Sequence, residues 1–186
     1  MRRLALIPVL VVLAFPSLAA CQVAEPGRAP ADDWPRIDAE RMIEDIRFLS
    51  SDELEGRRVE SEGNARAREY ILTAFQRIGL EPVGDGYTRE FSFVGRRDGV
   101  EYRGVNVVGM VRGSEHPERY IVLTAHYDHV GIGAPDESGD SIYNGADDNA
   151  SGTAALLALA DYSARNQPAH SIIFAAFDAE EMGLQG

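Results

Sequence analysis

The stretch YIVLTAH, residues 120–126, decides the fold of this 186-residue chain. It is apolar without alternation until its end, which is typical of a strand buried on both faces. SIIFAAF, residues 171–177, has the same character. Between them lies SGTAALLALADYSARN, residues 151–166, whose alanines and leucines indicate a helix. Strand, helix and strand at this spacing predict a parallel crossover unit.

Two amphipathic helices and a hairpin are expected before this unit. Apolar residues recur at helical spacing over residues 39–49, and Asp38 precedes them as an N-cap. A second helix is expected from about Ala65 to Ile78, because Gly79 follows as a C-terminal stop. Phenylalanines then alternate with polar residues before Asp98-Gly99, a hairpin turn signal followed by the β-branched run GVNVVGMV.

The composition is that of a globular protein with one domain. Hydrophobic residues make up 45% of the chain and charged residues 26%. The formal net charge is −12, and the acidic residues are spread along the chain. No basic stripe could neutralise phosphates, so we expect no nucleic-acid partner.

The first residues are typical of a targeting segment. Arg2 and Arg3 precede an apolar run too short to span a bilayer comfortably. Leu18-Ala19-Ala20-Cys21 resembles the lipobox of bacterial lipoproteins, and Cys21 is the only cysteine. We expect a signal peptide over residues 1–20, then a lipidated Cys21 and a flexible tether over residues 21–36. Export to a membrane-anchored position, periplasmic or at the cell surface, follows; the alternative is an ordinary secretory signal and a secreted protein.

Polar side chains gather where the elements of the crossover unit begin and end. They are His126 and Asp128 after the first strand, Asp147 and Asp148 before the helix, and Glu180 and Glu181 after the second strand. Each pair alone has an ordinary interpretation, as a polar strand terminus or a solvated acidic helix start. Ligands of open α/β sheets bind beyond the carboxyl ends of strands, so these side chains should converge. Their negative charge would be costly without a cation, which predicts divalent metal ions.

Three blocks, TAHYDHVG, NGADDNASG and FDAEEMGLQG, resemble in order and spacing the co-catalytic zinc aminopeptidase family. That family includes bacterial leucyl aminopeptidases and, more distantly, glutamate carboxypeptidases and glutaminyl cyclases. LSSDELEGR and FQRIGLEP resemble its entry segment, whereas Glu60 stands where relatives usually carry glycine. The resemblance implies that residues 37–186 are the N-terminal part of a zinc peptidase domain. The implied fold is α/β, a three-layer αβα sandwich around a mixed, mostly parallel sheet that is incomplete in this chain.

The resemblance also assigns roles to the site residues. It makes His126 a ligand of one Zn²⁺ ion, Asp148 the carboxylate that bridges two ions, and Glu181 a ligand of the second. Glu180 would be the general base, and Asp128 would orient His126. In relatives the peptide that joins the two aspartates is cis, so we expect a cis bond from Asp147 to Asp148, with Asp147 supporting the loop.

Two further metal ligands, an acidic residue and a histidine, lie downstream of the glutamate pair in relatives. We therefore expect this sequence to be the N-terminal portion of a longer enzyme, which alone binds metal weakly, catalyses little or nothing, and leaves a buried strand at an unpaired edge. His116 and His170 do not match the missing histidine. For His129, a tuning or solvent-facing role is more plausible than ligation.

The expected function is hydrolysis of peptide bonds at the N-terminus of peptides by a water activated by two zinc ions. Neighbouring side chains diverge, so Glu181 can face a metal while Glu180 faces the water. Two alternatives remain at this stage. One is a carboxypeptidase or glutaminyl cyclase on the same scaffold, and the other is a catalytically inactive, surface-anchored binding domain.

Overall fold

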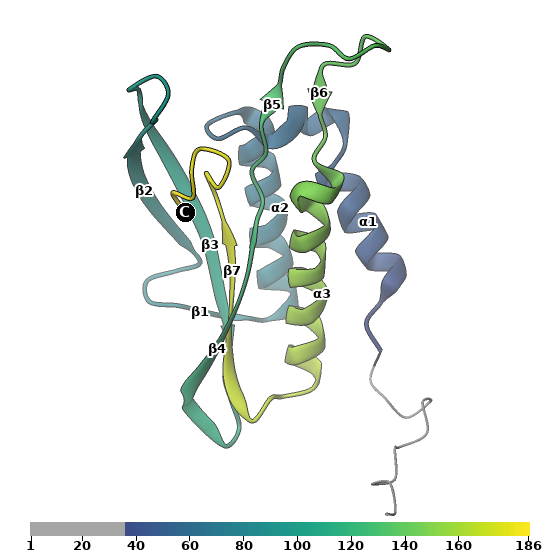
Figure 1. Ribbon diagram of the computed structural model, residues 1–186. Helices are drawn as coiled ribbons and strands as arrows, with labels where there is room; N and C mark the ends of the chain where they lie inside the picture. Colours follow the sequence, from purple (N-terminus) through teal and green to yellow (C-terminus); the bar gives the residue numbers. More distant parts are fainter. Residues whose placement is uncertain (1–35) are drawn as a thin grey trace, which may run out of the picture. The chain divides into compact units, whose positions relative to one another are not determined.

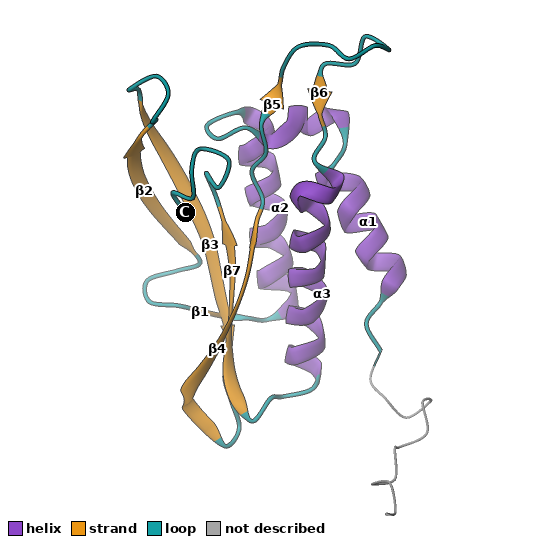
Figure 2. Cartoon of the chain, in the orientation of Figure 1, coloured by secondary structure: helices purple, strands orange, loops and turns teal. Residues whose placement is uncertain are grey.

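The structure is a computed structural model that describes residues 36–186. The expected signal peptide, the lipidation site Cys21 and the tether up to residue 35 lie outside the described residues. As the sequence predicts, two helices come first, a hairpin follows, and a strand-helix-strand unit ends the chain (Figures 1 and 2). The elements are α1 (Ala39–Leu49), the 3-10 helix η2 (Asp52–Arg57), α2 (Glu62–Ile78), β1 (Glu81–Pro82), β2 (Thr88–Val94), β3 (Glu101–Val111), β4 (His116–His126), β5 (Gly131–Ile132), β6 (Ile142–Tyr143), the π-helical turn η3 (Ala146–Ala150), α3 (Ser151–Arg165) and β7 (His170–Phe177).

The main sheet has five strands in the order β1-β3-β7-β4, with β2 also paired to β3. β4 and β7 are parallel, and α3 joins them, so the predicted crossover unit is confirmed. β1, β2 and β7 each run antiparallel to β3. The α/β class and the mixed sheet are confirmed. In the described residues, however, antiparallel pairs outnumber the single parallel pair, because β3 turns back from β2 in a hairpin and β7 then enters beside β3 in the opposite direction.

The three helices share one core with one face of the sheet (Figure 1). Phe174 and Ala176 of β7 are fully buried there, with Leu49 of α1, Phe75 of α2 and Leu157 of α3. The described residues therefore supply two of the three layers that the resemblance implies. Burial of these apolar side chains is the main force that holds the helices against the sheet.

β4 lies at an edge of the sheet, where β7 is its only neighbour among the described strands. Tyr120, Ile121 and Val122 in the middle of β4 are 54%, 49% and 55% exposed. The expectation that this strand is buried on both faces is thus wrong for the described residues, because an edge position leaves its side chains accessible. The expected unpaired edge is present.

Local sequence signals explain where α1 and α2 begin and end. Asp38 caps α1, since its Oδ1 accepts a hydrogen bond from the backbone N–H of Arg41 at 3.0 Å. α2 begins three residues earlier than predicted, because Ser61 caps it in the same way. It ends at Gly79, whose φ of 84° is the left-handed conformation that glycine adopts readily.

The start of α2 presses against η2. A Cβ atom at Gly63 would lie only 1.8 Å from the backbone oxygen of Leu54, so this contact requires glycine. The close approach holds η2 beside α2 and carries Arg57, the last residue of η2, into the interior. None of the helices in the described part of the chain is long and apolar enough to cross a membrane.

Candidate metal centre

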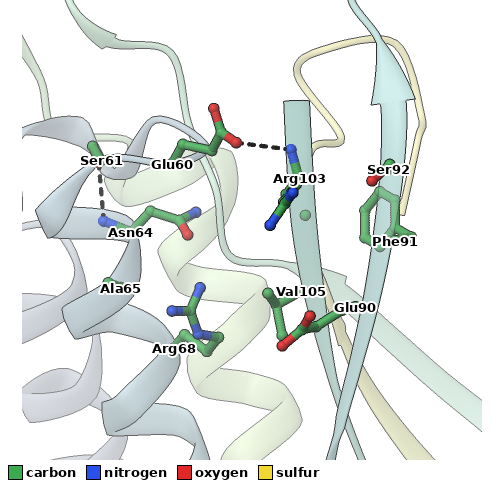
Figure 3. Close-up of a pocket in the computed structure, with 11 residues that line it drawn as sticks. Glu60, Ser61, Asn64, Ala65, Arg68, Glu90, Phe91, Ser92, Arg103 and Val105 are labelled. Carbon is green, nitrogen blue, oxygen red and sulfur yellow. Dashed lines mark hydrogen bonds between the residues drawn. The ribbon is translucent and has the colours of Figure 1, made fainter. Parts of the chain in front are cut away.

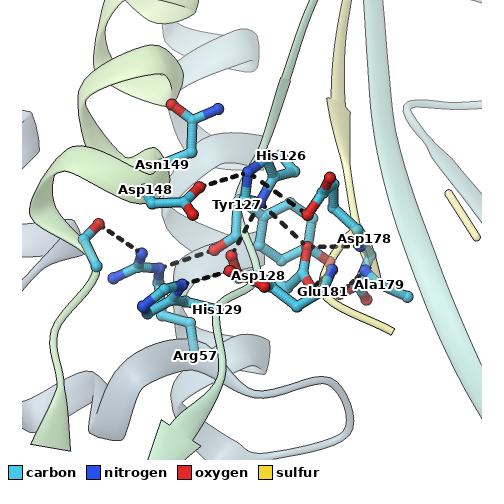
Figure 4. Close-up of polar contacts among 12 residues, drawn as sticks. Arg57, His126, Tyr127, Asp128, His129, Asp148, Asn149, Asp178, Ala179 and Glu181 are labelled. Carbon is cyan, nitrogen blue, oxygen red and sulfur yellow. Dashed lines mark hydrogen bonds and ion pairs between the residues drawn. The ribbon is translucent and has the colours of Figure 1, made fainter. Parts of the chain in front are cut away.

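The carboxyl ends of β4 and β7 meet at the same edge of the sheet because the two strands are parallel. η3, at the start of α3, approaches the same edge, and contacts β4 as well as α3. Figure 4 shows side chains from all three segments pointing toward one another. Of the six predicted site residues, the structure brings five together: His126, Asp128, Asp148, Glu180 and Glu181.

His126 faces two carboxylates at once. Its Nε2 lies 2.9 Å from Oδ1 of Asp148 and 3.9 Å from Oε2 of Glu180. The strand end supplies the imidazole and the turn η3 supplies the aspartate, as the sequence predicts. The imidazole and carboxylate pair is a donor set that zinc prefers.

Asp128 is almost fully buried and organises two parts of the site. Its carboxylate oxygens accept hydrogen bonds from the backbone N–H groups of Glu180, at 3.0 Å, and Glu181, at 3.2 Å. Its backbone oxygen lies 3.2 Å from Nδ1 of His126, and its carboxylate lies 3.6 Å from the same nitrogen. The structure thus places Asp128 beside His126, as expected, and also makes it an anchor for the glutamate turn.

The surroundings of His126 favour its cationic form in the metal-free protein. Burial alone would lower the pKa of His126, but the hydrogen bonds and charge of Asp128 and the charge of Glu180 outweigh burial. Together they raise the pKa to about 9. The site therefore stabilises positive charge at this position, which is also what a metal cation would supply.

His129 is closer to the centre than the sequence suggested. Its Nδ1 lies 2.6 Å from Oε1 of Glu181. His129, Asp148 and Glu181 each offer one ligand atom within 4.8 Å of the others. One imidazole and two carboxylates suit zinc, so the residues present fit this metal. The signal for His129 was its place three residues after His126, in the loop that follows β4.

Asp147 stands apart from this group. Its side chain is exposed and has no hydrogen bond or ion pair within residues 36–186, although its backbone oxygen accepts a hydrogen bond from Ser151. The expectation of a cis peptide between Asp147 and Asp148 is wrong, and the cis bond found among the described residues is the next one along the chain. It joins Asp148 to Asn149 rather than Asp147 to Asp148. The side-chain oxygen of Asn149 accepts a hydrogen bond from the N–H of Gly152 at the start of α3.

Arg57 is a buried residue that the sequence analysis did not select. It ends η2, is fully buried, and donates hydrogen bonds to backbone oxygens near both His126 and Asp148 (Figure 4). A polar residue in an irregular segment has no periodic pattern, so only its place in the block LSSDELEGR could have marked it.

Two cavities differ in their relation to this centre. A cavity of about 340 Å³ borders it directly and is lined by Asp128, His129 and Glu181, with Arg58 and Arg97 at its sides. A larger cavity of about 850 Å³ lies between α2 and the hairpin β2–β3 (Figure 3). None of the predicted site residues lines the larger cavity. The smaller cavity is therefore the better candidate for a substrate that must reach the metal ligands.

Residues 106–186 match the sequence model of Peptidase family M28. A probable zinc metalloprotease from Leptosphaeria maculans is 39% identical over 127 residues, which cover 67% of this chain and 29% of that protein. A glutamate carboxypeptidase 2 homolog from Caenorhabditis briggsae is 39% identical over 87 residues, 44% of this chain and 10% of its own length. The chain thus spans less than a third of these curated relatives.

Solved structures share the fold. A Zn-dependent exopeptidase from Parabacteroides distasonis superimposes with a TM-score of 0.63 at 22% identity, over 78% of this chain and 48% of its own. A glutaminyl cyclase from Tannerella forsythia gives a TM-score of 0.61 at 24% identity over the same shares. At this identity the likeness establishes the architecture alone.

Proposed function

Since residues 106–186 belong to peptidase family M28, a family of zinc metallopeptidases, we propose that this protein removes residues from the N-terminus of peptides with a water activated by two zinc ions. In this proposal His126 and Asp148 would hold one ion, and Asp148 and Glu181 would hold the second. The catalytic base is Glu180. Asp128 positions His126 and the glutamate turn.

The observation that carries the proposal is that Asp148 lies close to two sets of possible ligands. Its Oδ1 lies 2.9 Å from Nε2 of His126. Asp148 also offers a ligand atom within 4.8 Å of those of Glu181 and His129. Two neighbouring metal ions need a ligand between them, and a carboxylate that lies close both to His126 and to the pair of Glu181 and His129 can serve as that ligand.

When bound, zinc would supply a Lewis acid that lowers the pKa of a water molecule and polarises a carbonyl group. Glu180 performs the proton transfer. Glu180 lies in the turn after β7, and its backbone N–H donates to Asp128. Its Oε2 lies 3.9 Å from Nε2 of His126. Glu180 is thus close to the proposed metal ligands, but it is not part of the group formed by His129, Asp148 and Glu181. A carboxylate there can accept the proton of the attacking water and then donate it to the departing amine.

The test is the variant Glu180→Gln. The amide keeps the shape of the side chain but cannot accept a proton, so zinc content should stay unchanged while hydrolysis falls about 10²- to 10⁴-fold. The measurement is release of p-nitroaniline from leucine p-nitroanilide by zinc-loaded protein, with metal content determined by mass spectrometry. Glu69→Gln, on the exposed surface of α2, is the matched control and should retain full activity.

The substrate panel separates the competing functions. An N-acetylated substrate should not be cleaved, because the proposal requires a free amino terminus. Cyclisation of a glutaminyl peptide without hydrolysis of leucine p-nitroanilide would replace the aminopeptidase by a cyclase. Substantial turnover by Glu180→Gln would remove Glu180 from its role, and absence of any zinc-dependent reaction would favour a binding domain.

A further inference from the structure

Arg57 connects three segments of the chain through their backbones. Its Nε donates to the oxygen of Tyr127 at 2.8 Å, and its Nη1 donates to the oxygen of Asn144 at 2.7 Å. Nη2 donates to the oxygen of Gly145 at 3.0 Å, and Nη1 also contacts the oxygen of Leu49, at the end of α1. The side chain of Arg57 is fully buried, so these backbone oxygens take the place of water as its hydrogen-bond partners.

Three of the four acceptors of Arg57, the backbone oxygens of Tyr127, Asn144 and Gly145, belong to the two segments that carry proposed metal ligands, and the fourth is Leu49 at the end of α1. Tyr127 lies between His126 and Asp128 in the chain, and Gly145 lies three residues before Asp148. The planar guanidinium holds its donors at fixed mutual positions. The backbone oxygens of Tyr127 and Gly145, which bind two of these donors, are therefore held at a fixed separation. The ends of the same two segments place Nε2 of His126 2.9 Å from Oδ1 of Asp148.

The backbone of Arg57 strengthens this connection. Its carbonyl oxygen accepts hydrogen bonds from the N–H of His129, at 3.3 Å, and from the side chain of Asn64, at 3.2 Å. The same residue therefore contacts the loop after β4 through both its backbone and its side chain. Asn64 ties this contact to α2, a helix within the core.

The charge of Arg57 is held without a paired carboxylate. Among the described residues it has no ion pair, and its side-chain partners are neutral carbonyl groups. Burial lowers the pKa of Arg57 to about 10, although the charges of Asp128 and Asp148 act in the opposite direction. The guanidinium stays cationic at neutral pH. Burying this cation costs desolvation free energy. We explain its presence by the fixed positions that it imposes on the backbone segments it binds.

We propose that Arg57 is a positioning residue that sets the separation of His126 and Asp148 and thereby the affinity of the site for zinc. The inference rests on the proposed function only in that these two residues are metal ligands. Arg57 does not contact the metal or the reacting atoms. It acts through the backbones of Tyr127 and Gly145.

The experiment compares zinc affinities of the purified full protein and of Arg57→Lys and Arg57→Gln. Affinity is measured by competition with a chromophoric chelator, at a temperature where circular dichroism shows each variant to be folded. Lysine offers three donors from one point and cannot reach acceptors on three segments together. We expect zinc binding to weaken about 10- to 100-fold in Arg57→Gln, with Arg57→Lys between this variant and the unchanged protein.

Two controls distinguish positioning from a merely structural role. Arg66→Gln removes an exposed arginine, bonded to Glu53, and should leave zinc affinity unchanged. Ile71→Ala removes fully buried apolar volume from α2 and should lower the stability of the fold without changing zinc affinity. Weaker binding in the Arg57 variants but not in Ile71→Ala supports positioning. Equal affinity in folded Arg57 variants and unchanged protein overturns it.

A further variant covers the case in which the Arg57 variants do not fold. The side chain of Asn64 donates to the backbone oxygen of Arg57 at 3.2 Å and so holds Arg57 in place without being part of it. Asn64→Ala should weaken zinc binding in the same direction but less, and unchanged affinity in this folded variant would then overturn the inference. If the unchanged protein itself binds no zinc, the proposed function fails; if it binds zinc regardless of residue 57, only the present inference fails.

Discussion

The contact between His129 and Glu181 joins two residues from different strand ends. At 2.6 Å, it is the geometry of a hydrogen bond to a charged acceptor. Carboxylates that bind metal are themselves hydrogen-bonded in most sites, and such partners fix which oxygen faces the ion. His129 therefore orients Glu181 in the same way that Asp128 orients the turn that carries it.

At this scale we predict that His129→Gln weakens zinc binding about 10-fold, because glutamine is longer and less rigid than imidazole and holds Glu181 less firmly. The measurement is the zinc dissociation constant from chelator competition. His170→Gln, at the start of β7 with its ring tilted against that of His116, is the control and should bind zinc as the unchanged protein does. If His129→Gln and His170→Gln have the same zinc dissociation constant, groups other than His129 orient Glu181, and the prediction is wrong.

At the scale of elements, each helix buries one face. Ile71 of α2 is fully buried and belongs to the common core, whereas Ile43 of α1 is 54% exposed. Both are isoleucines within helices, so their intrinsic helix propensities are equal and only burial separates them.

We predict that Ile71→Ala lowers the free energy of unfolding by about 2–5 kcal/mol, since it removes apolar contacts and leaves a cavity. Ile43→Ala should change the free energy of unfolding by no more than about 0.5 kcal/mol. Urea unfolding followed by circular dichroism gives both values. Equal losses would mean that α1 packs in solution against more than the present core.

The sequence predicts these elements well because hydrophobic periodicity reports which face is buried. It also predicts the convergence of His126, Asp148 and Glu181, because parallel strand ends meet at one edge. It does not predict the contact of His129, since side chains in an irregular loop have no periodic direction. Burial of Arg57 was equally inaccessible, because it results from three separate segments closing over one side chain.

At the scale of the whole molecule, charge and metal affinity are coupled. The chain carries a formal net charge of −12, and its carboxylates are concentrated further at the site. Repulsion among these charges opposes the compact state, whereas a bound cation offsets it. A metal that binds the folded chain only must add its binding free energy to the stability of the fold.

We predict that zinc at 100 times its dissociation constant raises the free energy of unfolding by about 2.7 kcal/mol, and that chelation reverses the gain. Asp148→Asn should lose most of the gain, because it removes the carboxylate shared by both clusters. Asp161→Asn, bonded to Arg165 on the exposed side of α3, should keep it. Urea titrations with zinc and with chelator provide the measurement, and an equal gain in Asp148→Asn would contradict the assignment.

The strand order β3-β7-β4 has a consequence for synthesis on the ribosome. β3 and β4 emerge first, joined by a short connection, yet each is destined to pair with β7 rather than with the other. Until β7 leaves the exit tunnel, the nascent chain exposes two apolar strand edges that have no correct partner to bind. Chaperones that protect such edges should therefore bind this protein during translation. They should release it once β7 has paired with both β3 and β4.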